Sequence, residues 1–121
     1  MRLGLAIAFL IPCGAAWGND CTSIRFQRGT SGTVVTGTAY SETMTCYTLG
    51  TRAGQTATVE IIESGGEDTA FNIADLSHDS YIVDNRDKYS FQTVAGTYRI
   101  DVYRTFARGQ PVPFKMAVSV R

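Results

Sequence analysis

Histidine, cysteine, proline and net charge are all scarce in this sequence. Its 121 residues include one histidine, three cysteines and three prolines, and 11 basic residues balance 11 acidic ones. Nucleic-acid binders concentrate basic residues on one face, so this balance argues against nucleic acid as the main partner. A single histidine leaves too few ligands for a zinc site and only one route to a histidine-dependent catalytic centre. We therefore expect no metal, no cofactor and no catalytic residue.

Beyond its first 18 residues the sequence also lacks long apolar runs. Residues 1–18 contain one basic residue, an apolar run over residues 3–11 and then small residues, which is the pattern of a secretory signal peptide. We predict cleavage before Asn19, which leaves residues 19–121 as a single domain. No apolar run in that domain approaches the roughly 20 residues of a membrane-spanning helix.

The predicted leader indicates a periplasmic or secreted protein. A lipoprotein anchored at Cys13 is an alternative, but Pro12 occupies the position where such a signal needs a small residue. Export places Cys21 and Cys46 in an oxidising compartment, which favours a disulfide between them over a metal or catalytic thiol. That bridge closes a loop of about 26 residues and stabilises the fold by about 3 kcal/mol in the chain-entropy model.

Alternation of apolar and polar residues dominates the rest of the chain, and helical periodicity is nowhere sustained. The polar stretch 77–87 is expected to be a loop, and in the third expected strand Met44, Cys46 and Thr48 share one face. This pattern predicts an all-β fold, a two-sheet antiparallel β-sandwich of jelly-roll type with about eight strands. The expected strands are 23–27, 32–40, 44–49, 55–63, 69–74, 88–93, 98–104 and 113–120.

Candidate catalytic and metal-binding groups are few. His78 lies between Ser77 and Asp79, but neighbours in sequence do not make a catalytic triad, so a solvated loop histidine is favoured. Four acidic residues form a second cluster that could ligate Ca²⁺, although the spacing of known calcium loops is absent and Gly65-Gly66 more simply makes a hairpin turn. These acidic residues are Glu60, Glu63, Glu67 and Asp68.

Short motifs along nearly the whole predicted domain resemble a known family. They are Phe26-Gln27-Arg28-Gly29, Arg52-Ala53-Gly54-Gln55, Ala95-Gly96-Thr97-Tyr98 and the alternating run from Phe114 to Val120. Together they resemble the pre-peptidase C-terminal-like β-sandwich. Among free-standing secreted versions, the chain is similar to the bacterial periplasmic inhibitors of g-type lysozyme. The resemblance implies a non-enzymatic protein whose partner is a g-type lysozyme, and whose loops insert into the muramidase cleft.

The resemblance also suggests where the partner binds. Residues 95–98 resemble a Ser-Gly-x-Tyr turn of lysozyme inhibitors, although Ala95 lacks the serine hydroxyl. Tyr98 has two interpretations, a partner contact or a buried tyrosine corner that bonds to backbone. Aromatic residues and arginines on a proline-containing loop are typical of interface hot spots, and a solvated rim is the alternative for the arginines. The expected partner-binding residues are Tyr98, Tyr103, Arg104, Phe106 and Arg108.

Two other functions stay open at this point. The chain could be a carbohydrate- or peptide-binding module of the cell envelope, with Tyr40, Tyr47 and Tyr103 exposed to stack on sugars. It could also be an enzyme centred on His78.

Overall fold

The computed structural model describes residues 21–65, 68–105 and 110–121, and these residues form strands and connecting turns without a helix. Nine strands make up the all-β fold that the alternation predicts. They are β1 (Thr22–Ser23), β2 (Gly32–Ala39), β3 (Thr45–Thr51), β4 (Thr56–Ser64), β5 (Thr69–Asp75), β6 (Ser80–Arg86), β7 (Lys88–Gln92), β8 (Gly96–Arg104) and β9 (Val112–Val120). No helix in these ranges is long and apolar enough to cross a membrane.

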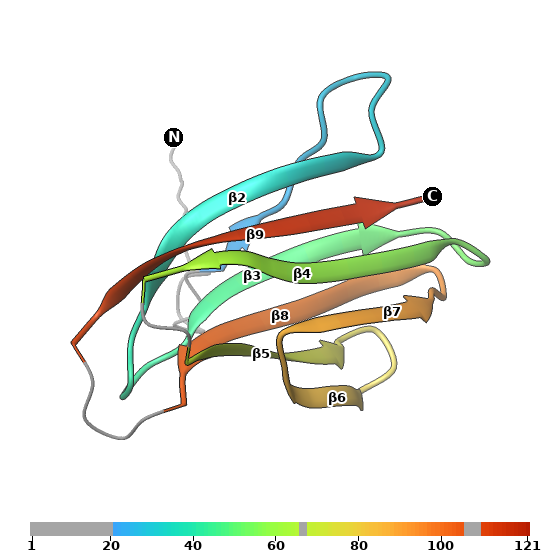
Figure 1. Cartoon of the computed structure of the whole chain (residues 1–121). Helices are drawn as coiled ribbons and strands as arrows, with labels where there is room; N and C mark the ends of the chain where they lie inside the picture. Colours follow the sequence, from blue (N-terminus) through green and yellow to red (C-terminus); the bar gives the residue numbers. More distant parts are fainter. Residues whose placement is uncertain (1–20, 66–67, 106–109) are drawn as a thin grey trace, which may run out of the picture.

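The strands form two sheets that face each other (Figure 1). One sheet has five strands in the order β1-β3-β8-β5-β6, and the other has four in the order β2-β9-β4-β7. Every pairing is antiparallel except that of β1 with β3, which is parallel. The predicted two-sheet antiparallel sandwich is therefore confirmed.

The core lies between the sheets and consists of alternate residues of the long strands. Because successive side chains of a strand point to opposite faces, a period of two places one apolar set inward. Phe91 and Tyr98 meet edge to face with ring centroids 5.0 Å apart, and Tyr47 meets Phe114 in the same way at 6.4 Å. The largest fully buried side chains are Tyr98, Phe71, Phe114, Leu49, Ile73, Ile100, Met116, Val59, Val102 and Val118.

Strand β3 corrects the predicted inner face of its segment. Tyr47 and Leu49 are buried, whereas Met44 is exposed before the strand begins. Tyr47 and Leu49 carry the larger apolar surfaces, and Tyr47 fills the space against Phe114, so burying this set gains more than burying Cys46 and Thr48. The expectation that Tyr47 is free to stack on a sugar is therefore wrong.

Two segments differ most from the prediction. Residues 77–87, expected to be a loop, contain β6, an edge strand that pairs only with β5 and whose register shifts twice. A strand at the edge with much of its surface in solvent tolerates a polar sequence that alternation does not reveal. Of the expected strand 23–27, only Ser23 lies in a strand, the two-residue β1, after which the Ile24 amide donates to the Thr48 carbonyl at 2.9 Å.

The predicted disulfide between Cys21 and Cys46 is present. It joins the residue that precedes β1 to the neighbouring strand β3 and so anchors the start of the described chain at one edge of the five-stranded sheet. The predicted signal peptide lies outside the described residues.

Candidate functional site

Three of the sequence motifs meet at one end of the sandwich. The loop before β2, the turn between β3 and β4, and the turn between β7 and β8 surround a cavity of about 650 Å³, whose lining includes Phe26, Ser31, Arg52, Gln55 and Thr97. We call this surface the motif end and define it as residues 26–31, 51–55 and 93–97. These segments are far apart in the sequence, and only the pairing of the strands brings them together.

The turn at residues 51–55 is held by hydrogen bonds around the buried hydroxyl of Thr93. This hydroxyl donates to the Arg52 carbonyl and accepts from the Gln55 amide at 3.1 Å. The Arg52 amide in turn donates to Gln55 Oε1 at 2.8 Å, and Gly54 takes the positive φ of 80° that the turn requires. None of these bonds uses the guanidinium of Arg52.

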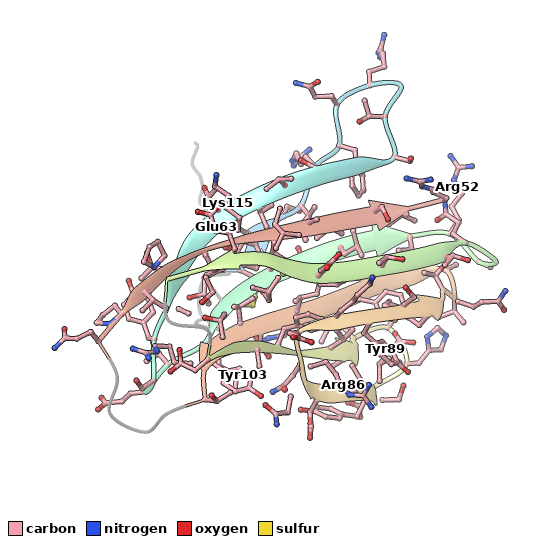
Figure 2. All side chains as sticks on the ribbon, viewed as in Figure 1. Arg52, Glu63, Arg86, Tyr89, Tyr103 and Lys115 are labelled. Atoms are coloured by element: carbon pink, nitrogen blue, oxygen red, sulfur yellow. A yellow bond between two sulfur atoms is a disulfide. The ribbon has the colours of Figure 1, made fainter. Side chains whose placement is uncertain are left out.

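The Arg52 side chain is exposed, and Figure 2 shows it at the tip of the sandwich near the C-terminus. The ion pairs found among residues 21–65, 68–105 and 110–121 involve other cations. A stiff turn therefore presents a free positive charge at the mouth of the motif-end cavity. Residues 52–55 form one of the motifs that carry the family resemblance, but Arg52 was not among the expected partner-binding residues.

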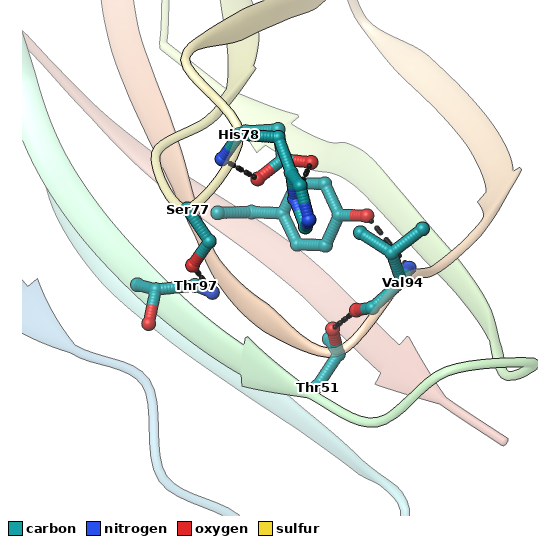
Figure 3. A network of polar contacts seen from close by, with 7 residues as sticks. Thr51, Ser77, His78, Val94 and Thr97 are labelled. Atoms are coloured by element: carbon teal, nitrogen blue, oxygen red, sulfur yellow. Dashed lines mark hydrogen bonds and ion pairs between the residues drawn. The ribbon is translucent and has the colours of Figure 1, made fainter.

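The adjoining turn at residues 93–97 is held in place by three hydrogen bonds (Figure 3). Thr51 Oγ1 donates to the Val94 carbonyl at 2.7 Å, and the Val94 amide donates to the Tyr98 hydroxyl at 2.9 Å. The Thr97 amide donates to Ser77 Oγ, also at 2.9 Å. Ser77 thus places a hydroxyl beside the turn in which Ala95 lacks one.

Gly96 makes the approach of Ser77 possible. Its φ of 145° is one that L side chains rarely adopt, and a Cβ at this position would collide with the Ser77 side chain. The backbone of the turn and the Ser77 hydroxyl are therefore packed directly against each other.

Tyr98 is 1% exposed, and its ring packs on Phe91 inside the core. The hydroxyl accepts a hydrogen bond from the backbone of the turn four residues upstream. This is the geometry of the tyrosine corner that the sequence left as one of two interpretations. In this structure Tyr98 positions the 93–97 turn from within.

His78 lies next to Ser77 but is not arranged as part of a catalytic triad. Its Nδ1 is 3.0 Å from Asp75 Oδ2, and its amide donates to Asp75 Oδ1 at 3.1 Å. Asp75 is 6% exposed and the His78 ring is 57% exposed. Ser77 Oγ is engaged with the Thr97 amide, and no contact with the imidazole is found in the described chain. The contacts between His78 and Asp75 close the loop between β5 and β6.

The acidic residues that the sequence suggested as a cluster are not brought together at one site among the described residues. Glu63 lies 3.4 Å from Lys115 on the outside of the four-stranded sheet, while Asp68 is nearly buried against Arg104. Glu67 lies outside the described residues. Among the residues that the structure describes, no group of three His, Cys, Asp or Glu side chains is placed to hold a metal ion.

Tyr103 and Arg104 lie at the opposite end of β8 from the motif end. Arg104 is six positions after Tyr98, which is about 20 Å along a strand. The predicted partner-binding set is therefore divided between the two ends of the sandwich. Phe106 and Arg108, which belong to the same predicted set, lie outside the described residues.

Arg104 is held by contacts within the chain. Its Nε is 3.1 Å from Asp68 Oδ2, its Nη2 contacts the same oxygen, and its Nη1 donates to the Gln110 carbonyl. The side chain of Arg104 is only 10% exposed and that of Asp68 only 8%. We call the surface formed by Asp68, Tyr103, Arg104 and Gln110 the Arg104 end.

Tyr103 belongs to a polar network on the outer face of the five-stranded sheet. Its hydroxyl lies 3.1 Å from Asn72 Oδ1 and 3.3 Å from Asn85 Oδ1, so one proton serves two acceptors. Burial raises the pKa of the Tyr103 hydroxyl, the negative charge of Asp84 and the neighbouring Tyr81 raise it further, and the backbone of Asn85 opposes them. This hydroxyl stays neutral and hydrogen-bonded at physiological pH.

Solved structures with the same fold include lysozyme inhibitors. The chain is similar to PliG of Aeromonas hydrophila, a periplasmic lysozyme inhibitor of g-type lysozyme, with 29% identity and a TM-score of 0.70 over 84% of this chain and 96% of that one. Salmonella Typhimurium PliG, also a periplasmic inhibitor of g-type lysozyme, has 18% identity and a TM-score of 0.61 over 85% of this chain and 99% of that one.

A third similar structure is the pre-peptidase C-terminal domain of collagenase from Bacillus anthracis, with 15% identity and a TM-score of 0.53 over 84% of this chain and 95% of that one. No protein-family model and no curated protein sequence matches the chain. The resemblance expected from the motifs is confirmed by these structures, which span nearly the whole described fold.

Proposed function

We propose that this protein is a periplasmic, non-enzymatic inhibitor of g-type lysozyme that docks its motif end into the substrate cleft of the enzyme. The observation that carries the proposal is the likeness to the Aeromonas inhibitor, which extends over almost the full length of that protein. The convergence of three family-like motifs on one cavity supports the motif end as the docking surface.

The chemistry of the motif end suits an acidic cleft. Muramidases use carboxyl groups to cleave the sugar chain. Arg52 would donate charge-assisted hydrogen bonds to such a carboxylate, which are stronger than bonds between neutral groups. Because the hydrogen bonds of Thr93 and Gln55 already hold the turn, little backbone freedom would be lost on binding.

In this proposal Tyr98 and Arg104 do not contact the enzyme, and each instead positions other residues of the inhibitor. Tyr98 is covered by the protein and sets the position of the 93–97 turn, while Arg104 neutralises Asp68 and ties down Gln110. Tyr103, Phe106 and Arg108 are proposed as secondary contacts, and of these three the structure describes Tyr103, at the Arg104 end. The two surfaces would meet different parts of the enzyme.

The test is a turbidity assay of peptidoglycan lysis by g-, c- and i-type lysozymes with the oxidised protein added. We expect suppression of the g-type enzyme and little effect on the others. Arg52→Ala should raise the inhibition constant about 30-fold, the size of an interface hot spot of about 2 kcal/mol. Lys88→Ala removes an exposed positive charge from β7, away from the motif end, and is the matched control.

Two results would contradict parts of the proposal. Equal inhibition by the parent and Arg52→Ala would show that the motif end does not dock through this arginine. A protein that slows none of the three enzymes but sediments with peptidoglycan would instead be the envelope-binding module, for which Tyr40 remains an exposed aromatic residue.

A further inference from the structure

The outer face of the five-stranded sheet carries one strongly exposed aromatic side chain among polar groups. Tyr81 of β6 is 62% exposed. Its backbone pairs with Ala74 of β5, and Ala74 pairs with Arg99 of β8. Cross-strand partners share a face of the sheet, so a residue with only a methyl side chain separates Tyr81 from Arg99 there. The Tyr81 ring therefore has no bulky cross-strand neighbour on β5.

Two carboxylates lie near the Tyr81 hydroxyl. Desolvation raises the pKa of this hydroxyl, and the negative charges of Asp84 and Asp101 raise it further, so the three groups are neighbours. Asp101 is bonded to Arg99, whose Nε lies 2.9 Å from Asp101 Oδ1. Asp84 forms no ion pair within the described part of the chain. Its carboxylate oxygens are free to accept hydrogen bonds from a ligand.

Two asparagines of the same face have their side-chain oxygens occupied and their side-chain nitrogens free. Asn72 Oδ1 accepts from the Asn85 amide at 2.9 Å and from the Tyr103 hydroxyl at 3.1 Å. Asn85 Oδ1 lies 3.3 Å from the same hydroxyl. Neither Nδ2 atom has an acceptor among residues 21–65, 68–105 and 110–121. The two carboxamides are thus held in place with their N–H donors unused.

The irregular pairing of β6 with β5 produces this arrangement. The register shifts on both sides of Ile73, and Asn85 has a positive φ of 58°. Bulges of this kind redirect side chains and backbone groups at the edge of a sheet. Here the Asn85 amide reaches the Asn72 side chain instead of the backbone of β5. Because the hydrogen bonds within the chain already orient both carboxamides, little freedom would be lost when a ligand binds them.

We propose that this face, which we call the Tyr81 face and define as Asn72, Tyr81, Asp84 and Asn85, binds the N-acetylated glycan strand of peptidoglycan. A sugar ring has an apolar C–H face that can lie on the Tyr81 ring. Its hydroxyl groups can donate to Asp84, and its hydroxyl and acetamido oxygens can accept from the carboxamide nitrogens of Asn72 and Asn85. An aromatic surface with a few fixed polar groups is the usual composition of a small-ligand site.

The surroundings of Tyr81 favour a neutral saccharide over other ligands. Asp84 and Asp101 place negative charge beside the ring, which opposes a phosphate chain. The polar neighbours of the ring differ from the apolar centre of a protein interface. Tyr81 does not line the motif-end cavity. The saccharide site is therefore independent of the proposed inhibition, and only the choice of peptidoglycan as the source of the sugar rests on the proposed periplasmic function.

The first test is an NMR titration of the oxidised protein with a soluble trimer of N-acetylglucosamine, up to about 10 mM. We expect saturable shifts of the Tyr81 amide signal and of the Nδ2 signals of Asn72 and Asn85. Tyr81→Ala should raise the dissociation constant at least about tenfold, and Tyr81→Phe should leave it within about twofold. Asn85→Asp keeps the side-chain oxygen and removes the N–H donors, so it should raise the constant about threefold at an unchanged thermal midpoint.

Three controls accompany the titration. Tyr40→Ala removes a tyrosine that is 42% exposed outside this face and should bind as the parent does. A trimer of glucose, which lacks acetamido groups, should give no saturable shift. The parent should sediment with insoluble peptidoglycan, and Tyr81→Ala should stay in solution. Glycan binding is measured without lysozyme, so its failure is distinct from a failure of inhibition.

Several results would overturn the proposal. They are the absence of saturable shifts, parental affinity in Tyr81→Ala, and loss of binding in Tyr40→Ala. Equal affinity for the glucose trimer would overturn the assignment of an N-acetylated sugar. Binding of the soluble trimer without sedimentation on peptidoglycan would overturn the assignment of the source.

Discussion

The two ends of strand β8 carry the same residue types and use them differently. At the motif end Tyr98 supports the 93–97 turn, which is bonded to the turn that carries Arg52, and at the Arg104 end Tyr103 precedes Arg104. At the motif end the arginine is exposed on a turn that other groups hold. At the Arg104 end the arginine is itself the group that holds the structure together. Residue type alone therefore does not distinguish an arginine that is free of ion pairs from one that holds the fold together.

Burial of the acidic partner explains this difference. Asp68 is nearly buried, and its Oδ1 has no hydrogen-bond partner among the described residues, so Oδ2 depends on Arg104. A buried carboxylate without a counter-charge is costly, which commits the arginine to it. Among the described residues Arg52 forms no ion pair with an acid, and its turn is held instead by neutral hydroxyl, amide and carbonyl groups.

Removing the Arg104 side chain should produce the largest effect on stability. Arg104→Ala leaves Asp68 buried and unpaired, and we expect the free energy of unfolding in urea to fall by about 3–5 kcal/mol. Arg52→Ala, the matched change at the motif end, should alter it by less than about 0.5 kcal/mol. Equal losses in the two variants would contradict the distinction between a structural and a free arginine. Asp68→Ala introduced together with Arg104→Ala should recover part of the loss.

Removing the hydroxyl of Tyr98 should lower the free energy of unfolding by a smaller amount. Tyr98→Phe keeps the buried ring but leaves the Val94 amide without its acceptor, which should cost about 1–2 kcal/mol in urea unfolding. Because the 93–97 turn loses a support, inhibition of g-type lysozyme should weaken as well, and the Val94 amide should exchange faster with deuterium. If inhibition and exchange stayed at parental values, Tyr98 would not be the residue that positions this turn.

The smallest effect concerns pH and lies at the Arg104 end. The pKa of Tyr103 is raised by burial and by Asp84, so the folded state holds this proton more tightly than the unfolded state. Its contribution to stability is complete below the ordinary tyrosine pKa of about 10 and is lost as the pH rises through the higher folded value. Urea midpoints should therefore fall on the alkaline side less steeply for Tyr103→Phe than for the parent. Identical slopes would exclude this contribution.

Much of the fold was predictable from local pattern. Alternation located most of the strands and most of the core, because a strand buried on one face must repeat every two residues. It failed at β6, where an exposed edge demands no apolar face, and at β3, where two alternating sets competed and the larger side chains were buried. The disulfide followed from the two cysteines that remain beyond the predicted leader.

The candidate site was predictable only in part. Its motifs are recognisable in the sequence, but the sequence does not show that they line one cavity. By itself the sequence determined the two-sheet sandwich, through the alternation along each strand, and the disulfide, through the single pair of cysteines beyond the predicted leader. Only the tertiary structure decided that residues 51–55 and 93–97 share a cavity while Arg104 lies at the far end of β8. It also decided which arginine is free, because pairing depends on whether the fold buries an acid beside the side chain.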